Sequence, residues 1–193
     1  MSISVLDMSM SLDGFIAGPN DTVDNPGGDG FAPLHTWLFD ENGEFRTTGV
    51  AAELGDMGAV VVGRLTAEQI DHWGGEHHHG PGVRIFVPSH RPPKPHVANY
   101  PLVTYVTDGI ESAMAQAKAA AGDRHVMVHG AYTAQRALEA GVLDELHIHH
   151  IPILLGNGKR LFDVLPRQLE LAIVRVVDTP EATHIRYRVS YPA

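Results

Sequence analysis

Apolar, β-prone runs alternate along the chain with stretches of helical character, and this alternation is the feature that most constrains the fold. The runs occupy residues 3–10, 58–63, 84–88, 102–106 and 125–129. Helices are expected to begin at Arg64 and at Tyr132, and the second should end at Gly141. Strands joined through helices cannot pair as tight hairpins, so the pattern predicts a largely parallel sheet.

The region between the last two runs predicts a further helix. Asp108 is a candidate N-cap with Glu111 three residues later, and Gly122 ends the pattern. The apolar residues expected to share one helix face are Ile110, Met114, Ala117 and Ala121. We therefore expect an amphipathic helix that packs on the sheet.

The character of the chain changes after Gly141. Strand-like runs follow at residues 145–155, 169–177 and 183–191, and residues 178–181 have the composition of a turn. In the last run apolar and polar residues alternate, with Thr183, Ile185, Tyr187, Val189 and Tyr191 on one side and His184, Arg186, Arg188 and Ser190 on the other. We expect antiparallel strands at this end of the sheet, the last with one buried and one solvated face.

The composition is that of an ordinary globular domain. The chain has 193 residues, of which 44% are hydrophobic and 19% charged, and we expect one domain over residues 1–193. Without a membrane-length apolar stretch or a signal-like N-terminus, the expected location is cytoplasmic. The net charge of −9 argues against a nucleic-acid partner. The absence of cysteine excludes disulfides, thiolate metal sites and thiol nucleophiles.

Two turns have the features of a phosphate-binding site. An apolar run stops at Gly63 just before Arg64 and Thr66, and another stops just before Gly130. Backbone N–H groups at a helix start are free to donate and carry partial positive charge. Glycine at such turns can also serve backbone geometry alone. Two of these turns in one small domain suggest a dinucleotide ligand, although neither matches the Rossmann fingerprint.

Four segments in one order resemble the signature blocks of a known family. They are residues 11–18, 62–66, 140–146 and 151–162. The family is the reductase domain of the bifunctional riboflavin-biosynthesis deaminase/reductase, together with its stand-alone dihydrofolate-reductase-like relatives. The resemblance implies a dihydrofolate-reductase-like three-layer α/β/α sandwich, with a mostly parallel sheet and antiparallel C-terminal strands. It also implies an NADPH cofactor, a small-molecule substrate and a homodimer.

The resemblance also assigns residues to NADPH. Those matched to the adenosine phosphates are Gly63, Arg64 and Thr66, and those beside the 2′-phosphate and adenine are Ser89, His90 and Arg91. The turn matched to the pyrophosphate consists of Gly130, Ala131, Tyr132 and Thr133. Arg64 and Arg91 would thus favour NADPH over NADH, while Ala131 stands where the family often has glycine.

The nicotinamide and substrate ends are matched by fewer residues. Asp13, Ile16 and Ala17 correspond to the segment near the nicotinamide ring. No clear proton donor is present: Asp13 and Asp40 are weak candidates, and a solvated acidic helix end is the favoured interpretation of Asp40. Lys159 and Arg160 are candidates for binding a substrate phosphate, or for capping a hairpin that faces a partner subunit.

Thirteen histidines raise the question of a metal site, particularly His72 with residues 77–79. His147 and His149 should share one face of a strand while His150 points to the other, so these three cannot bind one ion. A catalytic metal site needs about three ligands held by further partners. A histidine-rich loop is more often a solvated patch, and we expect no native metal.

The expected activity is that of an NADPH-dependent reductase. It would transfer a hydride to a small heterocyclic or carbonyl-type substrate, as implied by the resemblance to 5-amino-6-(5-phosphoribosylamino)uracil reductase. One alternative is a dihydrofolate reductase proper. The other is a non-catalytic nucleotide-binding or interaction module that keeps the fold.

Overall fold

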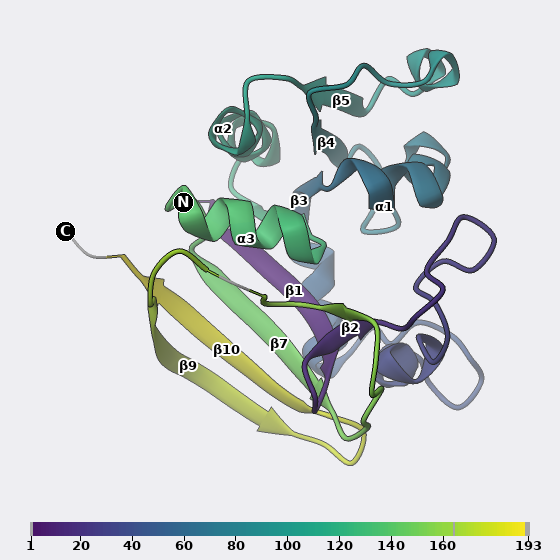
Figure 1. The fold of residues 1–193 in the computed structure, drawn as a ribbon, viewed down its shortest axis with the longest axis vertical. Helices are drawn as coiled ribbons and strands as arrows, with labels where there is room; N and C mark the ends of the chain where they lie inside the picture. The colour runs from purple at the N-terminus through teal and green to yellow at the C-terminus, as the bar shows by residue number, and fades with distance from the viewer. Residues whose placement is uncertain (1, 164, 192–193) are drawn as a thin grey trace.

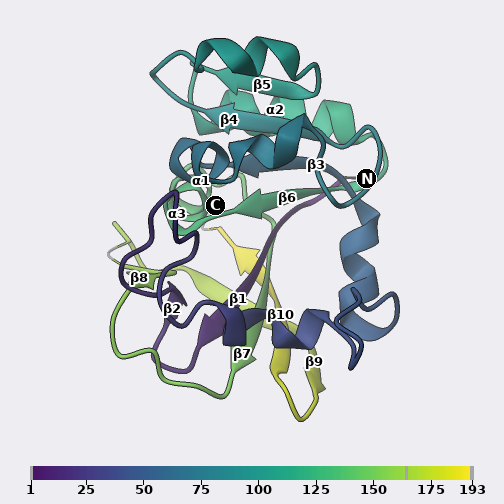
Figure 2. The same ribbon diagram turned by 90° about the vertical axis from the view of Figure 1, so that its right-hand side faces the viewer.

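The computed structural model describes residues 2–163 and 165–191. At its centre lies an eight-stranded sheet with the strand order β5-β4-β3-β6-β1-β7-β10-β9, seen from two directions in Figures 1 and 2. Its strands are β1 (Ser4–Ser11), β3 (Met57–Val62), β4 (Arg84–Pro88), β5 (Val103–Val106), β6 (His125–His129), β7 (Glu145–Ile151), β9 (Glu170–Asp178) and β10 (Thr183–Ser190). The strands from β5 to β7 pair in parallel, whereas β10 and β9 are antiparallel, as the sequence predicted.

Helices cover both faces of this sheet. They are α1 (Arg64–Gln69), α2 (Ile110–Ala121) and α3 (Ala131–Glu139), with the 3-10 helices η1 (Ala32–Leu38), η2 (Gly49–Asp56), η3 (Asp71–Gly75) and η4 (Pro95–Asn99). Helices α2 and α3 pack together on one face, and α1 packs on the other. The predicted three-layer α/β/α arrangement is confirmed. Among the described residues, no helix is both long and apolar enough to pass through a membrane.

The central strands are apolar on both sides because both of their faces are covered. Val61 of β3 and Val128 of β6 pack beneath α2 and α3, whereas Val60 and Val62 pack on the side of α1. Every residue of β3 is buried. This continuous burial fixes the register of β3 against β6, because a slip by one residue would exchange the two faces of the strand.

Two differences between the predicted and the observed boundaries have a clear physical cause. The N-cap of α2 is Gly109, with φ +95°, and Asp108 makes no side-chain bond to the helix start. A positive φ at this position is easily adopted by glycine, so the chain enters the helix one residue later than the capping pattern indicated. The strand predicted over residues 145–155 ends at Ile151, because Pro152 has no N–H group with which to continue the ladder.

The last strand was expected to have one solvated face, and that expectation is wrong for His184. This side chain is only 6% exposed, and its ring lies 4.8 Å from the ring of Trp37. The 3-10 helices η1 and η2 cover this half of the sheet, which a period-two pattern within β10 could not reveal.

A buried polar network lies between η1 and the sheet. His149 Nε2 is 3.0 Å from Asp7 Oδ1, and His149 Nδ1 is 2.7 Å from His184 Nδ1. Burial alone would raise the pKa of Asp7, but the charge of His149 and hydrogen bonds from His147 and His149 hold it well below its usual value. The hydrogen bond between the imidazoles fixes complementary donor and acceptor roles for the two rings.

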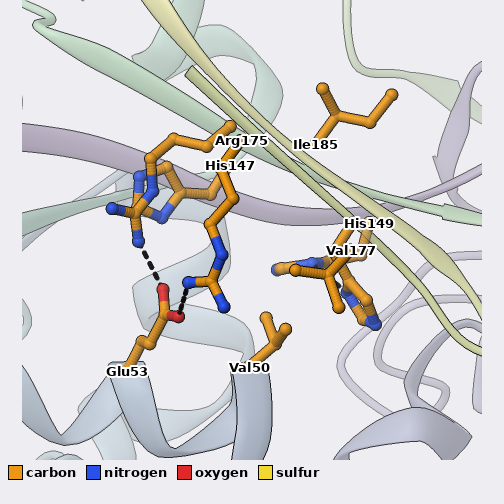
Figure 3. Close-up of a pocket in the computed structure, with 9 residues that line it drawn as sticks. Val50, Glu53, His147, His149, Arg175, Val177 and Ile185 are labelled. Carbon is orange, nitrogen blue, oxygen red and sulfur yellow. Dashed lines mark hydrogen bonds and ion pairs between the residues drawn. The ribbon is translucent and has the colours of Figure 1, made fainter. Parts of the chain in front are cut away.

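A small cavity opens beside this network, as Figure 3 shows. Glu53 of η2 forms ion pairs with Arg175 of β9 and Arg186 of β10. His147 and His149 line the same cavity. The ion pairs therefore connect η2 to the antiparallel end of the sheet, and they lie over the buried histidines.

A second sheet of two short strands lies beside the main one. It pairs β2 (Phe15–Ala17) with β8 (Lys159–Arg160) in antiparallel fashion. Gly158 leads into β8 with φ +137°, and a Cβ atom at this position would lie 2.0 Å from the Ala17 carbonyl oxygen. Close backbone approach therefore requires glycine at position 158.

We expect Gly158→Ala to lower the free energy of unfolding by about 3 kcal/mol, because it combines an unfavourable φ with a backbone clash. Chemical denaturation measures this loss. Gly156→Ala is the matched control, because Gly156 has φ +74° but a Cβ there would meet no described atom within 4 Å. It should cost only about 1 kcal/mol. Equal losses for the two variants would show that close packing at Gly158 is unimportant.

The buried histidines predict a loss of stability in mild acid. Burial lowers the pKa of His184 and of His129 from 6.5 to about 4, assisted by repulsion from neighbouring histidines. Below about pH 6.5 the unfolded chain takes up protons that the folded chain does not bind. Folded stability is therefore complete above that pH and falls as the pH falls toward about 4. Thermal unfolding should show a lower Tm at about pH 5 than at about pH 7.5.

Replacing one of these histidines provides the control for this effect. His184→Gln should make the fall in Tm shallower, whereas His90→Gln should leave it unchanged because His90 is exposed. A Tm independent of pH across this range would contradict the assignment of buried neutral histidines.

Candidate functional site

A cleft of about 1410 Å³ opens at the carboxyl ends of the parallel strands β3, β4 and β6. The starts of α1 and α3, the turn after β4, the β2–β8 sheet and the loop of residues 18–33 contribute to its walls. In Figure 2, α1, α3, β2 and β8 lie together at the left, toward the end of the strands to which the β6 arrow points. Open α/β sheets bind ligands at this edge, because loops and helix starts converge there.

The two glycine turns identified in the sequence face each other across this edge. The register pairs Val62 with His129, so β3 and β6 end side by side. A Cβ atom on Gly63 would lie 2.9 Å from Thr133 Oγ1, and one on Gly130 would lie 3.6 Å from Thr66 Oγ1. Gly63 therefore makes room for Thr133, whereas at Gly130 it is the φ of +93° that favours glycine.

Each turn leads directly into a helix. The first backbone bonds join Ala67 N–H to the Gly63 carbonyl and Ala134 N–H to the Gly130 carbonyl. The N–H groups of the preceding helical residues are the ones that such a start leaves without intrahelical acceptors. Two adjacent sets of donors thus border the cleft.

Basic side chains add positive charge to this edge. Arg64 forms an ion pair with Glu68 across one turn of α1, with Nη1 2.8 Å from Oε1. Beyond β4, Ser89 Oγ accepts a hydrogen bond from the Arg91 N–H at 3.0 Å and so orders the turn that carries this arginine. The arrangement is suited to an anionic ligand that extends from the glycine turns toward residue 91.

The structure brings together nearly all of the residues assigned from the sequence. Those lining the cleft are Ile16, Ala17, Gly63, Arg64, Thr66, Ser89, His90, Arg91, Gly130, Ala131, Tyr132 and Thr133, together with Lys159 and Arg160. They come from segments far apart in the chain. Parallel pairing of the central strands is what assembles them at one edge.

The two acidic candidates, Asp13 and Asp40, are not among the described residues that line this cleft. Asp13 accepts hydrogen bonds from the Ser11 hydroxyl and from the backbone N–H groups of Leu155 and Gly156. These bonds, with Ser11 first, lower its pKa to about 2. Asp40 accepts bonds from backbone N–H groups within its own turn. Both carboxylates therefore stabilise loops.

The candidate substrate residues Lys159 and Arg160 are positioned by contacts with neighbouring side chains. Lys159 Nζ lies 3.1 Å from Asp21 Oδ2, and this aspartate also accepts hydrogen bonds from Gly27 N–H and Gln69. The Arg160 guanidinium lies 4.5 Å from the centre of the Phe15 ring. Asp21 thus connects the loop of residues 18–33 both to α1 and to β8.

Three histidines in the cleft wall were not assigned to this site from the sequence. They are His35 of η1, His78 of the loop before β4, and His129 at the end of β6. Burial lowers the pKa of each, that of His129 to about 4, so all three are uncharged at neutral pH. His129 could have been identified because it directly precedes Gly130. His35 gave no sequence signal, because only the packing of η1 brings it to the cleft.

Comparison with solved structures finds the same fold in three proteins. A candidate riboflavin biosynthesis protein from Shewanella sp. PV-4 is 24% identical, with a TM-score of 0.74, over 98% of this chain and 99% of that chain. A pyrimidine reductase-like protein from Corynebacterium diphtheriae is 13% identical, with a TM-score of 0.65, and the match covers 99% of this chain and 92% of that chain. The deaminase and 5-amino-6-(5-phosphoribosylamino)uracil reductase of Thermotoga maritima is 14% identical, with a TM-score of 0.62, and the match covers 98% of this chain and 57% of that chain.

These similarities confirm the dihydrofolate-reductase-like fold predicted from the sequence blocks. Comparison with curated proteins gave no match. The family model described as the RibD C-terminal domain matches residues 4–185. Because this match spans nearly the whole sequence, the chain belongs to the family of the RibD C-terminal domain.

Proposed function

We propose that this protein is an NADPH-dependent reductase that acts on a small heterocyclic substrate of the pyrimidine-reductase type. The observation that carries the proposal is the meeting of the Gly63 and Gly130 turns in one large cleft with Arg64 and Arg91. Family membership supports an oxidoreductase role. The cleft exceeds the roughly 300–1,000 Å³ typical of small-molecule pockets, so it has room for a dinucleotide and a second small molecule.

The donor set fits the phosphates of NADPH. The backbone donors that precede Ala67 and Ala134 would bind the phosphates, with Thr66 and Thr133 adding hydroxyl groups. Arg91 would contact the 2′-phosphate, because its turn lies farther along the same edge. When bound, NADPH supplies the hydride. The chain's own residues need only bind and orient the reactants and exclude water.

The substrate would lie between β2 and the histidines of the cleft wall. Ile16 and Ala17 are buried and present a small apolar surface beside which the nicotinamide ring can lie. Lys159 and Arg160 would bind a phosphate of the substrate. His35 and His129 offer neutral imidazole groups near that position, and we propose that one of them relays the proton that accompanies hydride transfer, accepting a proton from water at one ring nitrogen as it releases one from the other.

A dihydrofolate reductase and a non-catalytic nucleotide-binding module remain as alternatives that assays separate. Oxidation of NADPH with the riboflavin-pathway pyrimidine but not with dihydrofolate supports the proposal, and the reverse result favours the first alternative. Binding of NADPH without turnover of either substrate favours the second. We also propose a cytoplasmic location, where NADPH is available.

The edge strand β9 is proposed as the contact between two copies of this chain. Leu171, Ile173 and Val176 are 44%, 66% and 54% exposed, and they share one face of the sheet because they pair with Val189, Tyr187 and Ile185; Val174, 43% exposed, lies at the irregularity in the strand. An unpaired apolar edge is a template for strand addition. Two identical edges related by a twofold axis are self-complementary in the antiparallel sense, which favours a homodimer.

The cofactor assignment predicts a difference between NADPH and NADH. NADPH should raise the Tm of the wild-type protein more than NADH does, because a ligand that binds the native state stabilises it. Arg64→Ala and Arg91→Ala should each weaken NADPH binding about tenfold or more, since a lost charge-assisted hydrogen bond costs about 1.5–3 kcal/mol. Calorimetric titration measures both affinities.

The control for Arg64 is its ion-pair partner. Glu68→Gln removes the ion pair but keeps the guanidinium, so it should leave NADPH affinity within about threefold of the wild type. If Glu68→Gln and Arg64→Ala weaken NADPH binding equally, Arg64 affects binding only by stabilising α1 through its ion pair with Glu68. Equal Tm shifts with NADPH and NADH would contradict the role assigned to Arg91.

The dimer proposal predicts that Ile173→Lys yields a folded monomer, because a charged side chain would be buried in the interface. Light scattering after gel filtration gives the mass. Leu154→Lys is the matched control, since Leu154 is 71% exposed but lies outside β9 and should leave a dimer. A wild-type protein that is monomeric at micromolar concentration would contradict the proposal.

A further inference from the structure

The segment that leaves α1 turns in a left-handed sense. Asp71, His72 and Trp73 have φ values of +45°, +54° and +55°, and two glycines with positive φ follow. Non-glycine residues rarely adopt this region, at a cost of roughly 1–2 kcal/mol each. The turn brings the side chains of Asp71 and His72 together with that of His96, which lies in η4.

These three side chains form a set of potential metal ligands. One ligand atom from each lies within 4.8 Å of the others. His96 Nε2 is 3.1 Å from Asp71 Oδ1, and His72 Nδ1 is 3.9 Å from the same oxygen. Ligand atoms around tetrahedral Zn²⁺ are about 3.4 Å apart, given zinc–nitrogen distances of about 2.0–2.1 Å. The observed separations lie on either side of that value.

His72 provides an independent observation. Its side chain is only 1% exposed, and Nδ1 has no hydrogen-bond partner among the described residues. The other ring nitrogen, Nε2, is 2.9 Å from the Tyr105 hydroxyl. The 3.9 Å separation between Nδ1 and Asp71 Oδ1 is too long for a hydrogen bond. A buried nitrogen thus lies near a carboxylate without being satisfied by it, and a cation between them would satisfy both.

Outer partners hold the ligands in place. With Nε2–H donating to Tyr105, the lone pair of His72 is on Nδ1, the nitrogen nearest to Asp71. The Tyr100 hydroxyl donates to Asp71 Oδ2 at 2.7 Å and leaves Oδ1 toward the histidines. Metal-binding histidines and carboxylates are typically oriented by such partners.

We propose that Asp71, His72 and His96 form a Zn²⁺ site, with water as the fourth ligand. Two imidazoles and a carboxylate suit zinc. The side chains of Asp71 and His96 are 60% and 48% exposed, so the ion can enter from solvent. On binding, the proton that His96 Nε2 otherwise donates to Asp71 moves to Nδ1, so that a neutral imidazole presents its Nε2 lone pair to the ion. The bound ion would stabilise the left-handed turn, and with it the position of Trp73 in the cleft wall.

This proposal departs from our expectation of no native metal. The sequence grouped His72 with residues 77–79, whereas the structure places it with Asp71 and His96. The run of three histidines also has ligand atoms within 4.8 Å of one another. However, His77 Nδ1 accepts a bond from the His79 N–H, and His79 Nε2 contacts the sulfur of Met127 at 3.0 Å. The set of Asp71, His72 and His96 is favoured because Tyr100 and Tyr105 orient the side chains of Asp71 and His72.

Metal titration of the chelator-treated full chain tests the site. Calorimetry with Zn²⁺ and absorption spectra with Co²⁺ should show one tight equivalent for the wild type. Asp71→Asn and His96→Gln should each weaken that binding at least about tenfold, as loss of one ligand requires. His72 is buried and its variants can fail to fold, so the two exposed positions carry the test.

The matched control is a histidine–carboxylate pair without a third ligand. His125 Nε2 lies 3.4 Å from Asp56 Oδ2, and His125→Gln should leave metal affinity unchanged. If replacing both His78 and His79 with Gln abolishes binding while Asp71→Asn does not, the ion binds the three-histidine run and the proposal is wrong. Absence of a stoichiometric equivalent in the wild type would also overturn it. None of these readouts depends on reductase activity.

Discussion

Parallel pairing of β3 with β6 is the constraint on which the rest of the structure depends. The register that joins Val62 to His129 ends the two strands at the same level, so the turns at Gly63 and Gly130 meet. Burial on both faces holds that register, because a slip by one residue would move Val60 and Val62 from the side of α1 to the side of α2 and α3. The core beneath α1, α2 and α3 therefore sets the geometry of the cleft as well as the stability of the fold.

The other half of the sheet is built differently. Where β7 and β10 pair, short 3-10 helices and a polar network replace the long helices, with Asp7, His149 and His184 in contact beneath Trp37. Polar groups are tolerated in such a place only when they are paired, and here each imidazole has a partner. One half of the sheet is therefore packed by an apolar core and the other half by a polar network. The cleft opens at the carboxyl ends of the parallel strands.

Local pattern was enough to predict most of the fold. The strand runs and the helices α1, α2 and α3 were recognisable, to within a residue or two at their ends, because their periodicity reflects the surfaces they bury. The glycine turns were recognisable because strand, glycine and helix start follow one another directly in the chain. Signature blocks added the nicotinamide and substrate segments, which line the cleft in the structure. Asp108 was assigned less well, because capping depends on contacts that a short sequence window does not contain, and Asp13 is not among the described residues that line the cleft.

The sequence by itself therefore determined the order of strands and helices, the two phosphate-type turns and the family. These features are encoded by neighbouring residues, whose spacing reflects local geometry. Only the tertiary structure decided that His35 reaches the cleft, that His184 is buried, and that His72 lies with Asp71 and His96 rather than with the three-histidine run. The physical reason is that these contacts depend on where 3-10 helices and a left-handed turn pack, and no periodic pattern in the sequence specifies that packing.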